Sequence, residues 1–221
     1  MRPTDALRES VREDWEAATR HAFTEALAAG TLPRWRMARY LVEDYRFIDG
    51  FVRLLASFIA HAPSLANAVP AAQFLALITG PENTYFQRSF EALGVRPTDH
   101  AVEEAPETAD FRLLMQEAAT SQRAERMLAV LVVAEWTYLD WATPHAARAP
   151  HLPTFLGDWI TLHSGEGFEG VVDYLRGQLD ALWDRLDASD REVAAETFRR
   201  AVALERAFFD AAWRDFRSKP T

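Results

Sequence analysis

The sequence has 221 residues, of which 49% are hydrophobic, and its formal net charge is -9 at pH 7. This length allows one large hydrophobic core, and because no stretch resembles a flexible linker, we expect a single domain over residues 1–221. The acidic balance argues against a surface that binds nucleic acid, and the absence of cysteine excludes disulfides, thiolate metal sites and thiol nucleophiles.

Helical periodicity of the apolar residues runs through the first half of the chain. Residues 4–29 carry an amphipathic pattern, and Thr4 is the predicted N-cap of this helix. A proline, which the first turn of a helix tolerates, opens a longer helix over residues 33–60. Residues 66–93 hold two shorter helices, which we expect to be separated by a break at residues 79–81, Thr-Gly-Pro.

The second half of the chain continues this pattern after an acidic, proline-containing connection over residues 96–107. A helix over residues 122–142 is apolar on almost every side, which predicts that it is the most buried element. Further helices are expected at residues 110–119, 154–163, 168–186 and 189–213. Because no strand or hairpin signature appears, the predicted fold class is all-α, a single-domain bundle of seven to eight helices.

No targeting or membrane segment is recognisable in the sequence. The first residues lack the apolar core of a signal peptide, and no uncharged run approaches the roughly 20 residues that a membrane span needs. We therefore expect a cytoplasmic protein that binds neither a membrane nor nucleic acid.

Three helices each place one acid in the middle of an apolar face. Asp44 lies at the centre of the stripe in residues 33–60, and Glu135 and Glu205 occupy the same kind of position on their own helices. Removing an unpaired charge from water costs several kcal/mol, so each acid either has a partner or awaits a ligand. An aromatic residue follows each of these acids at i+3, and two of these residues, Phe47 and Tyr138, point the same way as their acids.

Two interpretations of these acids remain open. In the first, each acid pairs with an arginine or tyrosine of the core, or lies at the rim of its helix. In the second, the acids and the aromatic rings form one pocket for a flat, partly basic heterocycle whose amines donate to the carboxylates. A carboxylate-bridged di-metal site is disfavoured because it needs Glu-x-x-His pairs, and the residues at i+3 from Glu135 and Glu205 are aromatic. We expect no metal and no other cofactor.

The sequence resembles the TenA family, which includes thiaminase II and has a haem-oxygenase-like helical fold. The resemblance is strongest in residues 40–47, Tyr-Leu-Val-Glu-Asp-Tyr-Arg-Phe. The other matching positions follow in order along nearly the whole chain: Trp15, His21, residues 30–33, Glu82, residues 134–138, residues 159–163, Ser164, Glu166, Phe168 and residues 205–213. The resemblance implies a pocket for the aminopyrimidine half of thiamin, and packing as a homodimer or homotetramer.

The resemblance also implies roles for individual residues. Asp44 and Glu205 correspond to the acids that hold the amino group and the ring nitrogen of the pyrimidine. Phe47 and Phe111 correspond to rings that sandwich it, although plain core packing is the alternative for both. Tyr138 corresponds to a tyrosine that supports the nucleophile.

Two departures from the family pattern bear on the reaction. The catalytic cysteine of thiaminase-type members is Ala134 here, and a tyrosine that precedes Ser164 is replaced by His163, for which helix capping is the alternative role. A branch of the family that lacks the cysteine is associated with hydrolysing amino- or formylamino-pyrimidines from degraded thiamin. This sequence resembles that branch better.

Our hypothesis is therefore a thiamin-salvage hydrolase that uses water to release the amine or formylamine from such an aminopyrimidine. Without a thiol, a carboxylate must act as the base or the nucleophile, and Glu135 is the first candidate. The candidate catalytic residues are Glu135, Tyr138 and Glu205, and the candidate substrate-binding residues are Asp44, Phe47, Phe111, Ala134 and His163. A non-catalytic or diverged binder of a small aminopyrimidine or related amine is the alternative. A nucleic-acid regulator is a third hypothesis, which the acidic charge disfavours.

Overall fold

The computed structural model describes residues 1–214 and 216, and the predicted domain boundary at residue 221 lies outside them. The chain is helical throughout this described part and has no strand there, which confirms the all-α class. In chain order the elements are α1 (Pro3–Ser10), α2 (Arg12–Thr19), α3 (Ala22–Ala28), α4 (Arg34–Ala60), α5 (Leu65–Leu77), the π-helix η1 (Ile78–Glu82), α6 (Asn83–Leu93), α7 (Pro97–His100), α8 (Pro106–Thr120), α9 (Ala124–Ala142), the 3-10 helix η2 (Thr143–His151), α10 (Thr154–Leu162), α11 (Glu166–Trp183) and α12 (Ala188–Trp213).

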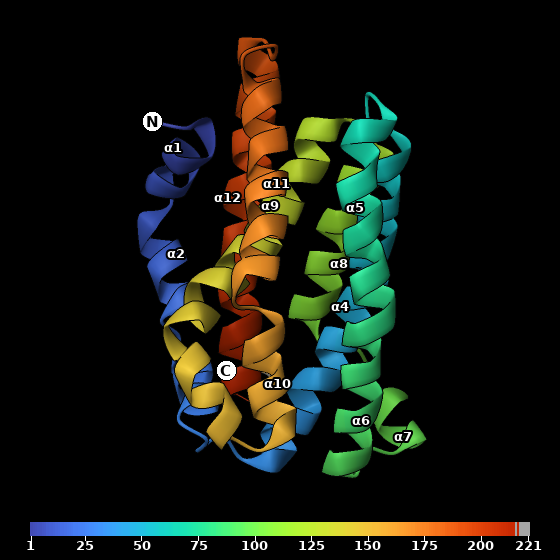
Figure 1. Ribbon diagram of the computed structural model, residues 1–221, viewed down its shortest axis with the longest axis vertical. Coiled ribbons are helices and arrows are strands. Elements are labelled where there is room, and N and C mark those ends of the chain that lie inside the picture. Colours follow the sequence, from blue (N-terminus) through green and yellow to red (C-terminus); the bar gives the residue numbers. More distant parts are fainter. Residues whose placement is uncertain (215, 217–221) are drawn as a thin grey trace.

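The N-terminal segment differs from the prediction of one helix over residues 4–29. Three short helices replace it, with bends at Val11 and at residues 20–21. The predicted N-cap is also wrong, because Thr4 lies inside α1 and its N–H and hydroxyl donate to Asp180 of α11, at 2.8 and 3.3 Å. The bends let α1 pack on α11, α2 on α9 and α12, and α3 on α10 and α12 in turn (Figure 1).

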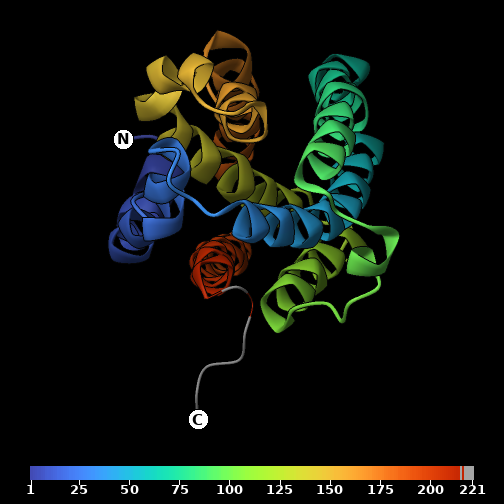
Figure 2. The same cartoon turned by 90° about the horizontal axis from the view of Figure 1, so that it is seen from below.

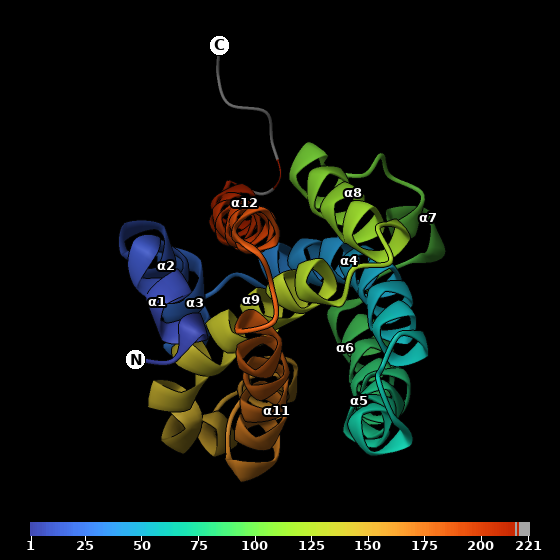
Figure 3. The same ribbon diagram turned by 90° about the horizontal axis from the view of Figure 1, so that it is seen from above.

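Helix α9 lies at the centre of the bundle. Seen from above (Figure 3), α12 and α11 lie on opposite sides of it, with α4 and α8 to one flank. It packs against α12, α11, α4, α8 and α2, and it has more buried residues than any other described helix. The prediction that this segment is the most buried element is confirmed. No helix in residues 1–214 combines the length and apolarity that a bilayer crossing requires.

Helix α4 joins the centre of the bundle to its outer arm. Seen from below (Figure 2), it runs between α8 and the arm formed by α5 and α6, and it packs on all three helices and on α9. Two apolar clusters meet along it. Phe47 and Phe51 belong to one cluster, Tyr40 to the other, and Ile48 contacts both. The inward face of α4 therefore lies at the junction of the two cores.

The predicted break at residues 79–81 is a π-helical turn. Helix α5 runs through η1 into α6 without a loop. Pro81 has no N–H to donate, and a wide turn accommodates such a residue without ending the helix. π-Helical turns are frequent at functional sites, and this one carries Ile78 and Glu82 toward α4 and α9.

Candidate active site

A small cavity lies among α4, η1, α9 and α10. The space within it that the centre of a water molecule can reach is about 20 Å³, which is room for about one water. Its lining is Asp44, Phe47, Ile48 and Phe51 from α4, Ile78 and Glu82 from η1, Ala134, Glu135 and Tyr138 from α9, Trp159 from α10, and His163. The cavity therefore combines three carboxyl groups, a phenol and an imidazole with aromatic and aliphatic walls.

Two buried carboxyl oxygens at this place have no hydrogen-bond partner. Asp44 is 3% exposed and Glu205 is 2% exposed, and neither Asp44 Oδ2 nor Glu205 Oε1 receives a hydrogen bond from any described residue. A buried polar atom left unpaired costs about 1–3 kcal/mol, so such atoms in folded proteins usually meet water or a ligand. Asp44 and Glu205 are therefore groups prepared for a polar molecule.

The acid next to Asp44 shows the opposite arrangement. Glu43 is fully buried, and its carboxylate has four partners: Arg39 Nη2 at 3.1 Å, Arg46 Nη1 at 2.8 Å, Thr108 Oγ1 at 2.7 Å and the Ala105 N–H at 3.2 Å. The interpretation in which an acid pairs with arginine therefore holds for Glu43, and it does not hold for Asp44. Glu43 ties α4 to α8 and its preceding loop, and Asp44 is left free to face the cavity.

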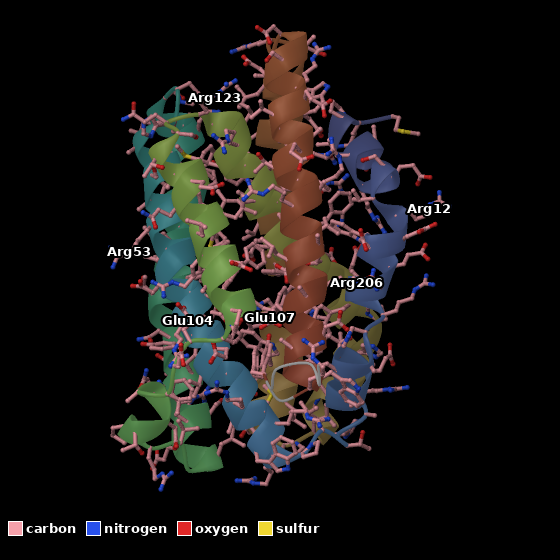
Figure 4. All side chains as sticks on the ribbon, turned by 180° about the vertical axis from the view of Figure 1, so that it is seen from behind. Arg12, Arg53, Glu104, Glu107, Arg123 and Arg206 are labelled. Atoms are coloured by element: carbon pink, nitrogen blue, oxygen red, sulfur yellow. The ribbon has the colours of Figure 1, made fainter. Side chains whose placement is uncertain are left out.

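Three arginines of α4 recur every seven residues, Arg39, Arg46 and Arg53, and they do not share one environment. Arg39 and Arg46 turn inward to Glu43. Only Arg53 points outward, with its side chain 76% exposed beside Asp49, and Figure 4 shows it at the outer edge of the bundle. Arg206 of α12 likewise projects from the surface toward Asp14 (Figure 4). These cations leave the acids of the cavity without a countercharge.

Four carboxyl groups influence one another electrostatically at the cavity. Burial raises the pKa of Glu82 to about 8. Burial, followed by the charges of Glu82, Glu205 and Asp44, raises the pKa of Glu135 well above its usual range. Burial and then the charge of Glu82 raise the pKa of Asp44, and burial and then Asp44 raise that of Glu205. Burial and mutual repulsion both favour the protonated form, so these groups resist ionising together.

The raised pKa of Glu82 predicts how stability depends on pH. A carboxyl whose pKa is higher in the folded state stabilises the fold fully below its unfolded value near 4.5, and this contribution is lost as pH rises toward 8. Glu82→Gln removes the titration, so we expect it to raise the melting temperature at pH 8.5 by about 10 °C, for about 4 kcal/mol, and to change little at pH 4.5. Thermal melts across this range measure the effect. Glu91→Gln, an exposed acid on α6, is the control, and equal pH profiles for the two variants would refute the prediction.

Tyr138 and His163 supply the other polar groups of the cavity. The Tyr138 hydroxyl lies 2.7 Å from the Tyr40 hydroxyl. His163 Nδ1 donates to the Trp159 carbonyl at 2.9 Å, and burial lowers the pKa of His163 to about 4. The imidazole is therefore neutral, with Nε2 as an acceptor. His163 is the C-cap residue of α10 and also lines the cavity.

The structure locates four further residues that the sequence analysis singled out: Phe47, Phe111, Ala134 and Glu205. Phe47 lines the cavity, whereas Phe111 does not; Phe111 packs edge-on against Phe47, with ring centres 4.9 Å apart. Ala134 is part of the lining and is 2% exposed. The methyl group of Ala134 thus forms part of the cavity wall. Glu205 lies outside the lining, and its charge nevertheless acts on Glu135 and Tyr138.

Sequence reasoning missed several members of the site. Glu82 was aligned with the family, but the Thr-Gly-Pro run before it indicated a chain break, so no helix face could be assigned to it. Trp159 lies in a matching segment to which no role was assigned, and Phe51 and Ile48 are apolar residues of α4, for which core packing is the ordinary expectation. The cavity brings all four together. In residues 1–214 and 216, no three histidine or acidic side chains are grouped as ligands of a metal ion.

A family comparison agrees with this geometry. Residues 8–215 match the model of the TENA/THI-4/PQQC family. The chain belongs to this family. The match covers every helix that lines the cavity, and it confirms the resemblance seen in the sequence.

The relatives of this TENA/THI-4/PQQC-family protein cover nearly its full length. An aminopyrimidine aminohydrolase of Halalkalibacterium halodurans is 22% identical over 95% of both chains, and one of Bacillus subtilis is 22% identical over 97% of this chain and 91% of its own. The structure of a TenA homologue from P. horikoshii has a TM-score of 0.84 at 20% identity, covering 97% of this chain and 100% of its own. A TenA family protein from a Silicibacter species, described as a transcription regulator, has a TM-score of 0.83 at 27% identity over 95% and 96%. These structures confirm the haem-oxygenase-like fold.

Proposed function

We propose that this protein is a thiamin-salvage hydrolase that releases the amine or formylamine from a 4-amino-5-aminomethylpyrimidine or its formyl derivative. The observation that supports it most is the pair of unpartnered, buried carboxyl oxygens of Asp44 and Glu205 at or near a small cavity. The names of the two bacterial aminohydrolases point to the same substrate class.

An aminopyrimidine complements these carboxyls in either charge state. A neutral carboxylic acid donates its proton to a ring nitrogen and accepts from the adjacent exocyclic amine. If the proton lies on the ring nitrogen instead, a negatively charged carboxylate accepts hydrogen bonds from the protonated ring nitrogen and from the same amine. Asp44 and Glu205, with pKa values raised by burial, are suited to this exchange. Phe47 and Trp159 supply flat walls for the ring faces.

The reaction breaks the bond between the methylene carbon and the amine nitrogen. The electron pair leaves with the nitrogen, which takes one proton, and a water oxygen bonds to the carbon and gives up one proton. The products are a hydroxymethylpyrimidine and ammonia, or formamide from the formyl substrate. Glu135 in its ionised form takes the proton from water, and protonated Glu82 gives one to the leaving nitrogen. Tyr138 orients the water or the leaving group.

The cavity must widen to admit this substrate. Room for about one water is far less than a substituted pyrimidine needs, so ring binding displaces water and moves part of the lining. Glu82 and Ile78 belong to η1, whose π-helical turn is the least regular part of that lining. We propose that this segment yields when the pyrimidine enters.

Product analysis tests the proposed reaction. Purified protein is incubated with 4-amino-5-aminomethyl-2-methylpyrimidine and, separately, with its formyl derivative. We expect mass spectrometry to detect hydroxymethylpyrimidine, and we expect an equal amount of ammonia from the amine or of formamide from the formyl derivative. The Glu135→Gln variant should give no detectable product. No product from either compound, where a cysteine-containing relative is active on its own substrate, would refute the hydrolase.

One observation favours the alternative of a non-catalytic binder. Ala134 lines the cavity, and the chain has no cysteine that could supply a thiol there; the family resemblance implies that Ala134 replaces the nucleophile of thiaminase-type members. Calorimetry separates the two proposals. Binding of the aminopyrimidine without any turnover would identify a binder, whereas binding with product release would identify the hydrolase.

We also propose that the protein forms a homodimer or homotetramer in the cytoplasm. Exposed apolar residues gather at one end of the bundle, where Trp35 is 53% exposed, Val102 47% and Trp213 39%. Arg36 lies over both indole rings, at 4.9 Å from Trp35 and 4.7 Å from Trp213. Contiguous apolar surface of this kind is typical of protein interfaces. Light scattering on the eluting protein gives the mass, and a value near 25 kDa would refute an oligomer.

A further inference from the structure

A pair of buried phenols lies beside the cavity, and only one of the two lines it. The Tyr40 and Tyr138 hydroxyl oxygens are 2.7 Å apart, a normal distance for a hydrogen bond between hydroxyls. Tyr40 is fully buried and is not among the lining residues, whereas Tyr138 is. Any effect of Tyr40 on a bound molecule therefore passes through Tyr138.

The ring of Tyr40 is held in place on several sides. Its ring centre lies 4.7 Å from that of Phe23, 5.7 Å from Phe208 and 6.3 Å from Trp159. Close packing of this kind leaves a buried side chain one orientation. The Tyr40 hydroxyl oxygen is consequently a fixed point to which Tyr138 bonds.

The hydroxyl proton of Tyr138 has two possible acceptors. It can be donated to the Tyr40 hydroxyl, 2.7 Å away, or toward Asp44, which lines the same cavity as Tyr138. Each phenol has one O–H to donate and lone pairs to accept with. A carboxylate is a stronger acceptor than a phenol. When Asp44 is ionised, Tyr138 therefore donates to it, and Tyr40 donates to Tyr138.

We propose that Tyr40 is a positioning residue whose hydroxyl directs the Tyr138 proton toward Asp44 and the bound aminopyrimidine. The inference rests on the proposed function for its kinetic consequences, because Tyr138 is the group that meets the substrate. Without the Tyr40 donor, the Tyr138 hydroxyl has no fixed partner behind it and turns among several directions. Substrate binding then changes little, while the fraction of molecules in the reactive arrangement falls.

Steady-state kinetics of three variants test the proposal. We expect Tyr40→Phe to lower kcat about tenfold and to leave KM within about threefold. We expect Tyr138→Phe to lower kcat by at least as much, and the double variant to be no slower than Tyr138→Phe alone, because Tyr40 acts only through Tyr138. Independent, multiplying losses in the double variant would overturn the proposal, since they would indicate a separate structural role.

Tyr85→Phe is the matched control. Tyr85 is as buried as Tyr40, at 1% exposed, and its hydroxyl donates to the Phe155 carbonyl at 2.8 Å. It is not part of the cavity lining. We expect this variant to lose some thermal stability and to keep kcat, so a tenfold loss here as well would overturn the specific role of Tyr40.

A spectroscopic measurement decides the question even if the protein proves inactive. The chain has five tyrosines, so tyrosine labelled with carbon-13 at Cζ gives few signals, and the Tyr138 signal is the one lost in Tyr138→Phe. We expect Tyr40→Phe to shift the Tyr138 signal and Tyr85→Phe to leave it in place. An unmoved Tyr138 signal in Tyr40→Phe would overturn the proposal, whereas absent turnover with a shifted signal would refute only the hydrolase.

Discussion

Asp44→Asn should weaken aminopyrimidine binding about a hundredfold and at the same time stabilise the protein. Asparagine keeps the shape of the side chain, but it can neither donate a carboxylic proton nor carry the charge that a protonated ring requires. Losing a charge-assisted hydrogen bond in a buried site costs about 1.5–3 kcal/mol, so we expect the Kd to rise about a hundredfold. Calorimetric titration with the aminopyrimidine measures the loss.

The expected gain in stability follows from the same burial. The pKa of Asp44 is raised in the folded state, so its contribution to stability is full below its unfolded value near 3.8 and is lost as pH rises. Asparagine does not titrate, so the stability of the Asp44→Asn variant does not fall with pH for this reason. The melting temperature of Asp44→Asn should therefore exceed that of the unmodified protein at pH 8, with the difference shrinking toward pH 4. A lower melting temperature at pH 8 would contradict the assignment of Asp44 as an unpartnered acid.

The neighbouring acid offers a control with the opposite expectation. Glu43→Gln leaves two partly buried arginines, Arg39 and Arg46, without the fully buried carboxylate that pairs with them. Breaking a buried pair in this way costs about 3–5 kcal/mol, so we expect a melting temperature lower by about 10 °C. The folded fraction should still bind the aminopyrimidine. If the two variants behaved alike, the contrast between adjacent acids on α4 would be wrong.

Glu135→Gln should remove turnover while leaving binding intact. Glu135 lines the cavity, and a glutamine cannot accept the proton of the attacking water. General base catalysis contributes about 10²- to 10⁴-fold, so we expect kcat to fall about a thousandfold with Kd unchanged within about threefold. Mass spectrometry of the hydroxymethylpyrimidine product and calorimetry of the substrate complex measure the two quantities.

The control for this variant lies on the same helix. Glu125 is at the start of α9, where it pairs with Arg123 outside the cavity. Glu125→Gln should keep kcat. Unchanged turnover in Glu135→Gln would remove Glu135 as the base and would turn attention to Glu205, the other acid considered for that role.

The sequence was sufficient to predict most of the helices and to predict which residues face the core. Helical periodicity depends only on local spacing, so the burial of α9 and the apolar face of α4 were readable from residue order. The bends in α1–α3 could not be predicted in this way, because contacts with distant residues hold these helices. The Thr4 N–H, for example, donates a hydrogen bond to Asp180, which lies 176 positions away in the chain.

The partners of the acids were decided by the tertiary structure. Glu43 and Asp44 are adjacent in sequence and similar in chemistry, and only the position of α8 gives Glu43 the Thr108 hydroxyl and the Ala105 N–H. Asp44, one residue later and turned by about 100° around the helix, meets no such group.

The amino-acid sequence by itself determined an all-α chain in which Asp44, Glu135 and Glu205 interrupt apolar faces. It did not determine which acids lack partners, nor that a π-helical turn adds Glu82 to the same cavity. The physical reason is that the direction of a side chain follows from local helix geometry, whereas hydrogen bonding, desolvation and charge coupling depend on groups that other helices bring alongside it.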